Sequence, residues 1–525
     1  MKKNILGILL AIVGACTACA VDWTIMDGQE TTYSVAGIFQ DGMVLQRDVS
    51  VPVWGWAPPH TAVTVTFAGQ RKSASSDAKG RWQVALDPLA ASFDPREMTV
   101  QAATVGFDEQ ISNILVGEVW VLSGQSNMVF WLEGAIGGEA AAATADYPWL
   151  RTFDVGFQLS DAPARDVSVR SAWQECTPES AGKFSAVGFW MAQRLYAELQ
   201  VPIGLITNAV SGTYGECWVP REVLESIPAA RARLDEYAAA LEVLPQEQAR
   251  FDAELTTYQV SVATALQSRA TEPAKSFFLK KGPMGPKHFH RPYGLYNGCV
   301  APLMPYAVRG VVWYQGEGNS QKHRAVYYEP LLEGLVDSWR AGWGQDALPF
   351  LVVQLPRFVP GVHNDWPLLR EAQRQATERL NDTHLVVTID TGNANDIHPI
   401  DKAPVADRVA ALALQEVYGK SVAGRSPAPV IIESANGIVM IRFENVGSGL
   451  VARQGAPRCF ELAGADGVFV SAEASLVAPN QIQLSAATVH DAEQVRYAYS
   501  NVPDVNVFSS SGLPLVPFCS EILEN

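Results

Sequence analysis

The hydrophobic pattern changes twice along the chain. Residues 33–115 contain short runs rich in β-branched and aromatic residues, separated by Gly, Pro and Asp. Residues 51–56, 63–67 and 82–86 are three such runs. Short, closely spaced strands with turn residues between them are typical of a β-sandwich. We therefore predict an N-terminal β-sandwich over residues 33–115.

From residue 116 the pattern becomes that of a different fold class. Near-continuous apolar runs alternate with stretches of helical periodicity, such as residues 184–199 and 366–380. Strands that are apolar on both faces indicate a parallel sheet covered by helices. Five runs are expected to form this sheet: residues 118–123, 202–207, 308–314, 349–354 and 385–389. The prediction is an α/β domain over residues 116–418.

Two further segments complete the expected organisation. Residues 221–268 are rich in Ala, Glu and Leu and poor in Gly, which predicts helices inserted between the second and third strands. After residue 418 the β pattern returns, with strands expected at 437–443, 482–484 and 494–499. We predict a second β domain over residues 419–525.

The N-terminus has the pattern of a secretory signal peptide over residues 1–20. Lysines precede an apolar run at residues 5–13, and small residues follow as far as Ala20. The apolar run is too short to span a bilayer. The residues before Cys16 and Cys19 resemble lipoprotein cleavage sites, and simple cleavage after Ala20 is the alternative. We expect an exported protein that is either periplasmic or lipid-anchored at the bacterial envelope, with no other membrane contact.

Composition excludes some partners. The chain has 525 residues, 48% of them hydrophobic and 18% charged, as in a globular protein with a large core. Its formal net charge is −16. Such an acidic chain is not expected to follow a phosphate backbone, so we predict no nucleic-acid partner.

The cysteines predict neither a disulfide framework nor a metal site. Five follow the predicted signal peptide, and they form no CxxC pair. Cys459 and Cys519 share the C-terminal region and could pair in an oxidising compartment. Buried free thiols are at least as good an interpretation.

The candidate chemistry lies at the ends of the predicted strands. Ligands of open parallel sheets gather at the carboxyl ends of the strands. Four of the five strands run into small, polar, glycine-containing segments: residues 123–128, 208–213, 315–319 and 390–399. Any one of them fits an ordinary turn. Four at one sheet edge predict an active site.

Within these segments, Ser126 is the candidate nucleophile, although an N-cap serine fits the same position. Of eight histidines, only His398 follows a strand end with carboxylates nearby, so it is the candidate base. Asp396, two residues before it, could orient the imidazole, and Asp390 is the rival for this role. The alternative for the segment is a turn in which Asp396 caps the next helix.

The remaining candidates would stabilise the oxyanion or contact substrate. For the oxyanion we nominate the backbone amides of Gly212 and Ser126 and the side-chain amide of Asn319. Four side chains could line the acyl or sugar pocket: Gln125, Trp218, Gln315 and Glu317. Core packing is an equally good interpretation of Trp218. The glycine-rich runs do not match a phosphate-binding loop.

Several of these segments resemble those of one known family. The run EVWVLSGQSNM at residues 118–128 resembles the nucleophile block of bacterial sialate O-acetylesterases, which belong to the SGNH hydrolase superfamily. The runs WYQGEGN at 313–319 and DIHP at 396–399 resemble the third and final blocks of that family. The likeness extends over roughly residues 38–517.

The resemblance implies a flavodoxin-like catalytic domain with accessory β-sandwiches. It assigns Ser126 as nucleophile, Gly212 and Asn319 as oxyanion-hole groups, and His398 with Asp396 as base and acid. It implies no metal and no organic cofactor.

The chain also departs from the family pattern. Ser211 stands where a first glycine is common, and Tyr214 and Gly215 stand where Pro-Ile is common. Many SGNH hydrolases have the acid three residues before the histidine, where this chain has Asn395. The helical insertion is also longer than is common in the family.

The sequence therefore predicts a serine esterase that removes O-acetyl groups from sugars through an acyl-enzyme on Ser126. The substrate would be an O-acetylated sialic acid or an acetylated plant polysaccharide such as xylan or xyloglucan. A non-catalytic carbohydrate-binding surface protein is the alternative from another class. A lipase of the α/β-hydrolase type would have a GxSxG elbow, whose second glycine is missing here.

Overall fold

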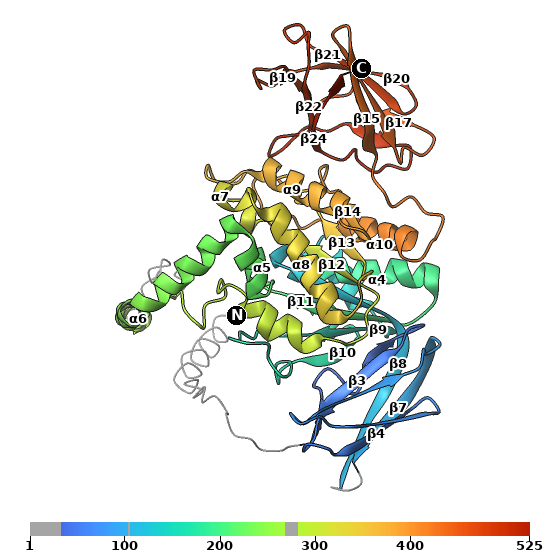
Figure 1. Cartoon of the computed structure of the whole chain (residues 1–525), viewed down its shortest axis with the longest axis vertical. Helices are drawn as coiled ribbons and strands as arrows, with labels where there is room; N and C mark the ends of the chain where they lie inside the picture. The colour runs from blue at the N-terminus through green and yellow to red at the C-terminus, as the bar shows by residue number, and fades with distance from the viewer. Residues whose placement is uncertain (1–32, 103–105, 268–281, 525) are drawn as a thin grey trace.

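The computed structural model describes residues 33–102, 106–267 and 282–524. Two β-rich regions lie at opposite ends of a central α/β region (Figure 1). The expected signal peptide, residues 1–20, lies outside the described residues. Within the described part of the chain, no helix is long and apolar enough to cross a membrane.

The N-terminal β region consists of two sheets that share a core around Trp54 and Trp82. One sheet has the order β1-β3-β6, with β1 Ser34–Val35, β3 Val51–Trp56 and β6 Arg81–Leu86. The other contains β2 Val44–Gln46, β4 Ala62–Phe67, β5 Gln70–Ser75, β7 Ser92–Ala102 and the start of β8 Phe107–Gly124. Along β6, buried and exposed side chains alternate, as expected of a strand with one face on a core.

Strand β8 joins this region to the central sheet. Its first part pairs antiparallel with β7, as far as Val116 opposite Ser92. Its second part pairs in parallel with β11 and β12. The boundary predicted between residues 115 and 116 therefore falls inside one continuous strand of 18 residues.

The central sheet contains a strand at each of the five predicted runs, although the run at 385–389 overlaps β14 only at Leu385 and Val386. Its order is β10-β9-β11-β8-β12-β13-β14. The remaining strands are β9 Tyr147–Asp154, β10 Ala172–Cys176, β11 Ile203–Ala209, β12 Gly310–Tyr314, β13 Phe350–Val353 and β14 Thr383–Val386. Two strands were not expected from the sequence: β9, which is parallel to β11, and β10, which lies antiparallel at the edge.

Helices cover both faces of this sheet, which explains why its strands are apolar throughout. On β12, Val311 belongs to the core shared with α8 Tyr328–Trp343 and α9 Trp366–Arg379. The next residue, Val312, belongs to the core shared with α4 Ala186–Leu199 and α10 Ala403–Glu416. α4 and α9 match the predicted helices at 184–199 and 366–380.

The helical segment expected at residues 221–268 consists of α5 Arg221–Ser226 and α6 Pro228–Gln267. Figure 1 shows α6 projecting away from the body of the molecule. Residue 268 lies outside the described ranges.

The C-terminal β region begins after α10. One sheet has the order β20-β21-β16-β15-β25, another β19-β18-β22-β24, and β17 pairs with β23. The strands are β15 Ala428–Ala435, β16 Ile438–Glu444, β17 Leu450–Ala452, β18 Phe460–Ala463, β19 Val470–Ser471, β20 Glu473–Ala478, β21 Gln481–Ser485, β22 Gln494–Tyr497, β23 Val507–Ser509, β24 Phe518–Glu521 and β25 Leu523–Glu524. The predicted runs at 437–443, 482–484 and 494–499 correspond to β16, β21 and β22. The buried Arg370 of α9 anchors this region by donating hydrogen bonds to the carbonyl oxygens of Ser500 and Asn501.

The pairing considered for Cys459 and Cys519 is absent, and both residues are free thiols. Cys459 precedes β18 and Cys519 lies in β24, with β22 between these two strands. Two strand spacings amount to about 9.6 Å. This exceeds the Cα separation of about 7 Å that a disulfide can bridge.

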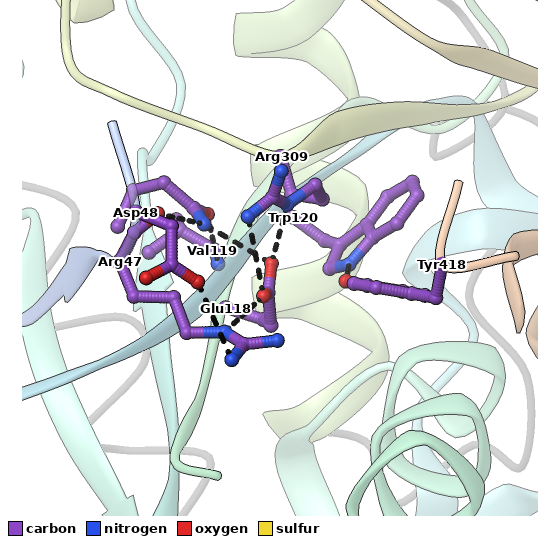
Figure 2. Close-up of polar contacts among 8 residues, drawn as sticks. Arg47, Asp48, Glu118, Val119, Trp120, Arg309 and Tyr418 are labelled. Atoms are coloured by element: carbon purple, nitrogen blue, oxygen red, sulfur yellow. Dashed lines mark hydrogen bonds and ion pairs between the residues drawn. The ribbon is translucent and has the colours of Figure 1, made fainter. Parts of the chain in front are cut away.

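A buried charge cluster lies where β8 enters the central sheet (Figure 2). The fully buried Glu118 carboxylate accepts hydrogen bonds from Arg47 Nε at 2.5 Å, Arg309 Nε at 2.7 Å and Gln46 Nε2 at 3.0 Å. Nearby, Trp120 Nε1 donates to the Tyr418 hydroxyl at 3.0 Å. Arg47 and Gln46 come from the N-terminal β region, so the cluster ties that region to the central sheet.

Candidate active site

The end of β8 places Ser126 at the carboxyl edge of the central sheet. Gly124 has φ +131° and is the last residue of the strand, and Ser126 is the first residue of helix α2, Ser126–Val129. A Cβ atom on Gly124 would lie 2.1 Å from the carbonyl oxygen of Tyr314 in β12. Only glycine fits this turn, which presents Ser126 beyond the sheet edge.

Ser126 and His398 meet across this edge. The Ser126 Oγ atom lies 2.8 Å from His398 Nε2, within hydrogen-bonding distance. Both residues are partly exposed. Since neutral imidazole accepts at one nitrogen, Nε2 is placed to take the hydroxyl proton. This is the contact expected between a nucleophile and its general base.

The two candidate acids are engaged differently. Asp396 Oδ1 accepts the backbone N–H of His398 at 2.9 Å, and the His398 Nδ1 atom makes no hydrogen bond to any described residue. Asp390 accepts two hydrogen bonds from Arg408, at 2.6 and 2.7 Å, and this pair occupies both carboxylate oxygens. Asp396 is therefore the candidate closer to the histidine, through its backbone.

The surroundings of His398 favour its neutral form. Burial lowers the pKa of His398, the Lys402 ammonium lowers it further, and the Asp396 carboxylate opposes both effects. Lys402 is itself buried, which lowers its pKa to about 8. A base with a lowered pKa stays free to accept a proton in mildly acidic solution.

A buried polar chain lies behind the histidine. Lys402 Nζ donates to Asn127 Oδ1 at 2.5 Å, and Asn127 Nδ2 donates to Glu317 Oε1 at 2.5 Å and to the Ile397 carbonyl oxygen at 3.0 Å. Burial raises the pKa of Glu317, although the Asn127 hydrogen bond and Lys402 oppose the shift. The chain links the segment after Ser126 to the segment that contains His398.

The side chain of Asn319 is held in one orientation. Its Oδ1 atom accepts from Gly215 N and Gln315 Nε2, each at 2.8 Å, and its Nδ2 atom donates to Glu216 Oε2 at 2.8 Å. An amide nitrogen carries two hydrogens. The second one has no partner among the described residues, although the side chain is fully buried.

Glu216 is in turn fixed by its own partners. Its Oε1 atom accepts hydrogen bonds from Tyr327 at 2.6 Å and from Arg324. All these groups are buried or nearly so. Glu216 thus orients Asn319 through a buried ion pair.

The two nominated backbone amides are also available. Gly212 lies in the left-handed region with φ +72°, and its carbonyl oxygen is 2.7 Å from His290 Nε2. Its N–H makes no hydrogen bond within the part of the chain that the structure describes. The N–H of Ser126 lies at the start of α2, where helical amides have no partner within the helix.

The four proposed substrate-binding side chains are all buried: Gln125, Trp218, Gln315 and Glu317. Gln125 accepts from Gly318 N at 3.3 Å, and Gln315 also receives the Tyr328 hydroxyl at 2.8 Å. Trp218 packs against Trp313, and its Nε1 atom donates to Thr213 at 3.0 Å. In this structure their contacts are with protein groups, and substrate contact stays a prediction.

Sequence reasoning missed Lys402, Asn127 and Glu216. Asn127 lies in the nucleophile block and Glu216 in the segment after Gly212, so their positions were a usable signal. Lys402 follows His398 by four residues, and a lone lysine before a helix is usually a surface residue. Among the described residues, no group of His, Cys, Asp and Glu is arranged to hold a metal ion.

Comparison with known proteins agrees with this geometry. Residues 287–407 match the family model of carbohydrate esterases described as sialic acid-specific acetylesterases. The chain is 27% identical to the sialate O-acetylesterase of Mus musculus, over 78% of this chain and 79% of that one. The human sialate O-acetylesterase is also 27% identical, over 76% and 74% of the two chains.

A solved structure decides the assignment. A carbohydrate acetylesterase from Xanthomonas citri is 32% identical, with a TM-score of 0.76, over 93% of this chain and 99% of that one. This chain belongs to the sialate O-acetylesterase family. As a member of that family it is an esterase, and the likeness to the Xanthomonas enzyme supports an SGNH-like fold.

Proposed function

We propose that this esterase removes O-acetyl groups from sugars, with Ser126 as nucleophile and His398 as base. The observation that supports this role is the 2.8 Å contact between Ser126 Oγ and His398 Nε2. Within the fold, we propose that β11, β8, β12, β13 and β14 form the flavodoxin-like SGNH core and that β9 and β10 are additions to it.

In the first half of the reaction, Ser126 Oγ attacks the acetyl carbonyl carbon while its proton passes to His398 Nε2. The carbonyl oxygen becomes negatively charged. It then accepts hydrogen bonds from the amides of Gly212 and Ser126 and from the free Asn319 Nδ2 hydrogen. The bond to the sugar oxygen then breaks, and His398 gives its proton to that oxygen. The sugar leaves and acetyl-Ser126 remains.

In the second half, His398 Nε2 takes a proton from water as the water oxygen attacks the acetyl carbon. The bond to Ser126 breaks, the proton returns to Ser126 Oγ, and acetic acid leaves, losing its own proton to solvent. The imidazolium formed in each half is stabilised by a nearby negative charge. We assign this role to Asp396, whose carboxylate already holds the His398 backbone.

The substrate class follows from the family. The curated relatives are named sialate O-acetylesterases, and the Xanthomonas neighbour is described as a carbohydrate acetylesterase. O-acetylated sialic acid and acetylated plant polysaccharides are the two substrates to compare. Acetate release from O-acetyl sialic acid, measured beside release from acetylated xylan and xyloglucan fragments, decides between them.

The competing hypothesis is a carbohydrate-binding protein with an inert hydrolase region. Hydrolysis of p-nitrophenyl acetate by the wild type and by Ser126→Ala separates the two. We expect the variant to lose activity by a factor of about 10⁴ or more. Equally slow hydrolysis by both proteins would rule out the esterase mechanism on Ser126.

We also propose that the protein is exported and acts in the periplasm or on a lipid anchor. The support is the basic, apolar and small-residue pattern of residues 1–20. Mass spectrometry of the mature N-terminus tests this, because a lipidated Cys16 or Cys19 and an unmodified Val21 have different masses. Recovery of the intact N-terminus from the cytosol would contradict export.

A further inference from the structure

A large cavity opens beside the nucleophile loop. It has a volume of about 700 Å³ and lies over the carboxyl ends of β9 and β11. The side chains that matter here are Val129, Trp131, Asp154, Phe157, Lys183 and Ser211. Pockets that bind ligands of several rings have volumes of roughly 300–1,000 Å³. The cavity is therefore large enough for more than the acetyl group.

The walls of this cavity are continuous with the candidate catalytic groups. Val129 is the last residue of α2, the helix that begins at Ser126. Ser211 immediately precedes Gly212, and the Val210 N–H donates to the Gly124 carbonyl oxygen at 3.2 Å, which holds the two loops together. The cavity therefore lies next to the two segments that carry Ser126 and Gly212.

Two aromatic rings are exposed at the cavity. Trp131 is 50% exposed and Phe157 is 52% exposed, although burial would stabilise such large apolar side chains. The C–H face of a sugar ring packs well against an aromatic ring because both surfaces are flat and weakly polar. Exposed rings beside polar groups are the arrangement that this packing requires.

Trp131 is held in place before any ligand arrives. The Lys183 ammonium lies 3.9 Å from the centre of its ring on one side and pairs with Glu133. The backbone of Trp131 forms a β-bridge with Ser185. The ring therefore loses little freedom when a ligand packs against its open side.

Polar groups line the same cavity as the two rings. Asp154 at the end of β9 uses Oδ1 to accept the Gly156 N–H at 2.9 Å, and it is exposed. Glu179, also on the cavity wall, is exposed as well. These carboxylates can accept hydrogen bonds from sugar hydroxyls, whereas the one lysine is already paired. The negative charge of the carboxylates favours a neutral glycan chain over an anionic one.

We infer that this cavity is a glycan subsite that binds the sugars next to the acetylated one, with Trp131 and Phe157 as stacking platforms. The inference rests on the proposed function, because it places the acetylated sugar at Ser126. The ligand is a neutral oligosaccharide of at least two sugars. The enzyme then selects acetyl groups on chains over those on single sugars.

The kinetic experiment uses the full chain and acetylated xylo-oligosaccharides of one to four sugars. For the wild type, kcat/KM is expected to rise at least tenfold from one sugar to three, mainly because KM falls. Trp131→Ala and Phe157→Ala are each expected to remove most of that rise. Phe93→Ala is the matched control, since Phe93 is 46% exposed, lies in the N-terminal β region and should keep the rise.

A binding measurement separates the subsite from the chemistry. Ser126→Ala should bind acetylated xylotriose in calorimetry, and the double variant with Trp131→Ala should bind it at least tenfold more weakly. Absence of binding, or equal binding by both proteins, would overturn the subsite. So would a wild-type kcat/KM that does not change with chain length. Loss of all hydrolysis with binding intact would instead count against the proposed function alone.

Discussion

At the scale of single residues, the proposed base His398 makes its pKa the expected limit of activity in acid. Only neutral imidazole can take the Ser126 proton, so activity falls as the pH falls through this pKa. Burial and Lys402 both lower it. The acid limb of kcat/KM is therefore expected below the ordinary histidine pKa of about 6.5.

Lys402→Met tests the charge effect. The substitution keeps an unbranched apolar stem near Phe130, over whose ring the ammonium lies at 4.7 Å. With the cation gone, the pKa of His398 rises and the acid limb moves up by a few tenths to about one pH unit. Asp396→Asn should move it down, because Asp396 raises that pKa. A pH profile with p-nitrophenyl acetate reports both shifts, and equal shifts in one direction would contradict the assignment.

The proposed oxyanion role of Asn319 and its orientation by Glu216 can be tested with two variants. Asn319→Ala removes an oxyanion donor and is expected to lower kcat by a factor of about 10²–10³. Glu216→Gln keeps the size of the side chain but can present an N–H to Asn319 instead of an acceptor. We expect it to lower kcat roughly tenfold with little change in KM. Steady-state kinetics of both variants, with circular dichroism to verify folding, provide the measurement.

Ser126 and His398 could be nominated from the sequence because each follows a predicted strand, and the structure brings the two side chains together at one sheet edge. Lys402 could not be found in this way, and the only signal for Glu216 was its place in the segment after Gly212. Their importance comes from burial and from partners far along the chain, such as Arg324 for Glu216 and Asn127 for Lys402. Pattern analysis sees neither property.

At the scale of elements, β9 shows where hydrophobic patterning fails. This strand contains Pro148, Arg151 and Asp154, which gives it a polar appearance. Arg151 is nevertheless buried, because its guanidinium donates to the Gly42 carbonyl oxygen at 2.9 Å and to Asn113 Oδ1 at 2.8 Å. The N-terminal β region supplies these acceptors, so β9 becomes recognisable only in the folded chain. The five predicted strands needed no such partner, since helices bury both of their faces.

The turn after β8 gives an element-scale prediction. Gly124→Ala would place a Cβ atom 2.1 Å from the Tyr314 carbonyl oxygen, so β8 and β12 must separate at the sheet edge. We expect the melting temperature to fall by several degrees and esterase activity to fall at least a hundredfold. Gly69→Ala is the control, because Gly69 also has positive φ but open space around its Cβ position. It should cost only about 1 kcal/mol of stability.

At the scale of the whole molecule, the Glu118 cluster links two regions that the sequence treats as separate. Glu118→Gln would leave Arg47 and Arg309 without their shared carboxylate in a buried setting. Breaking such a pair destabilises a protein by about 3–5 kcal/mol. Thermal unfolding should show one transition, shifted to lower temperature, rather than loss of the N-terminal region alone. The exposed Glu139→Gln serves as the control and should leave the transition unchanged.

The second predicted junction, residue 418, lies between the end of α10 at Glu416 and the start of β15 at Ala428. Residue 115 lies inside strand β8, not between two elements. A change from alternating to continuous apolar residues marks a change of surroundings, and a single strand can pass from one setting to another. The sequence thus located the change of environment within β8 but could not show that the backbone continues through it.

The continuity of β8 has a mechanical consequence. The strand has 18 residues, but it is not uniformly extended, because Asn113 has φ +55° and the pairing with β7 shifts register. It connects the N-terminal β region at one end with the Ser126 turn at the other, and it is hydrogen-bonded to neighbouring strands along both of its parts. A load applied to that region, such as attachment to a surface, would reach the Ser126 turn through the backbone itself. We therefore expect attachment through the N-terminal β region to disturb the Ser126 turn more than attachment through the C-terminal β region, which β8 does not enter.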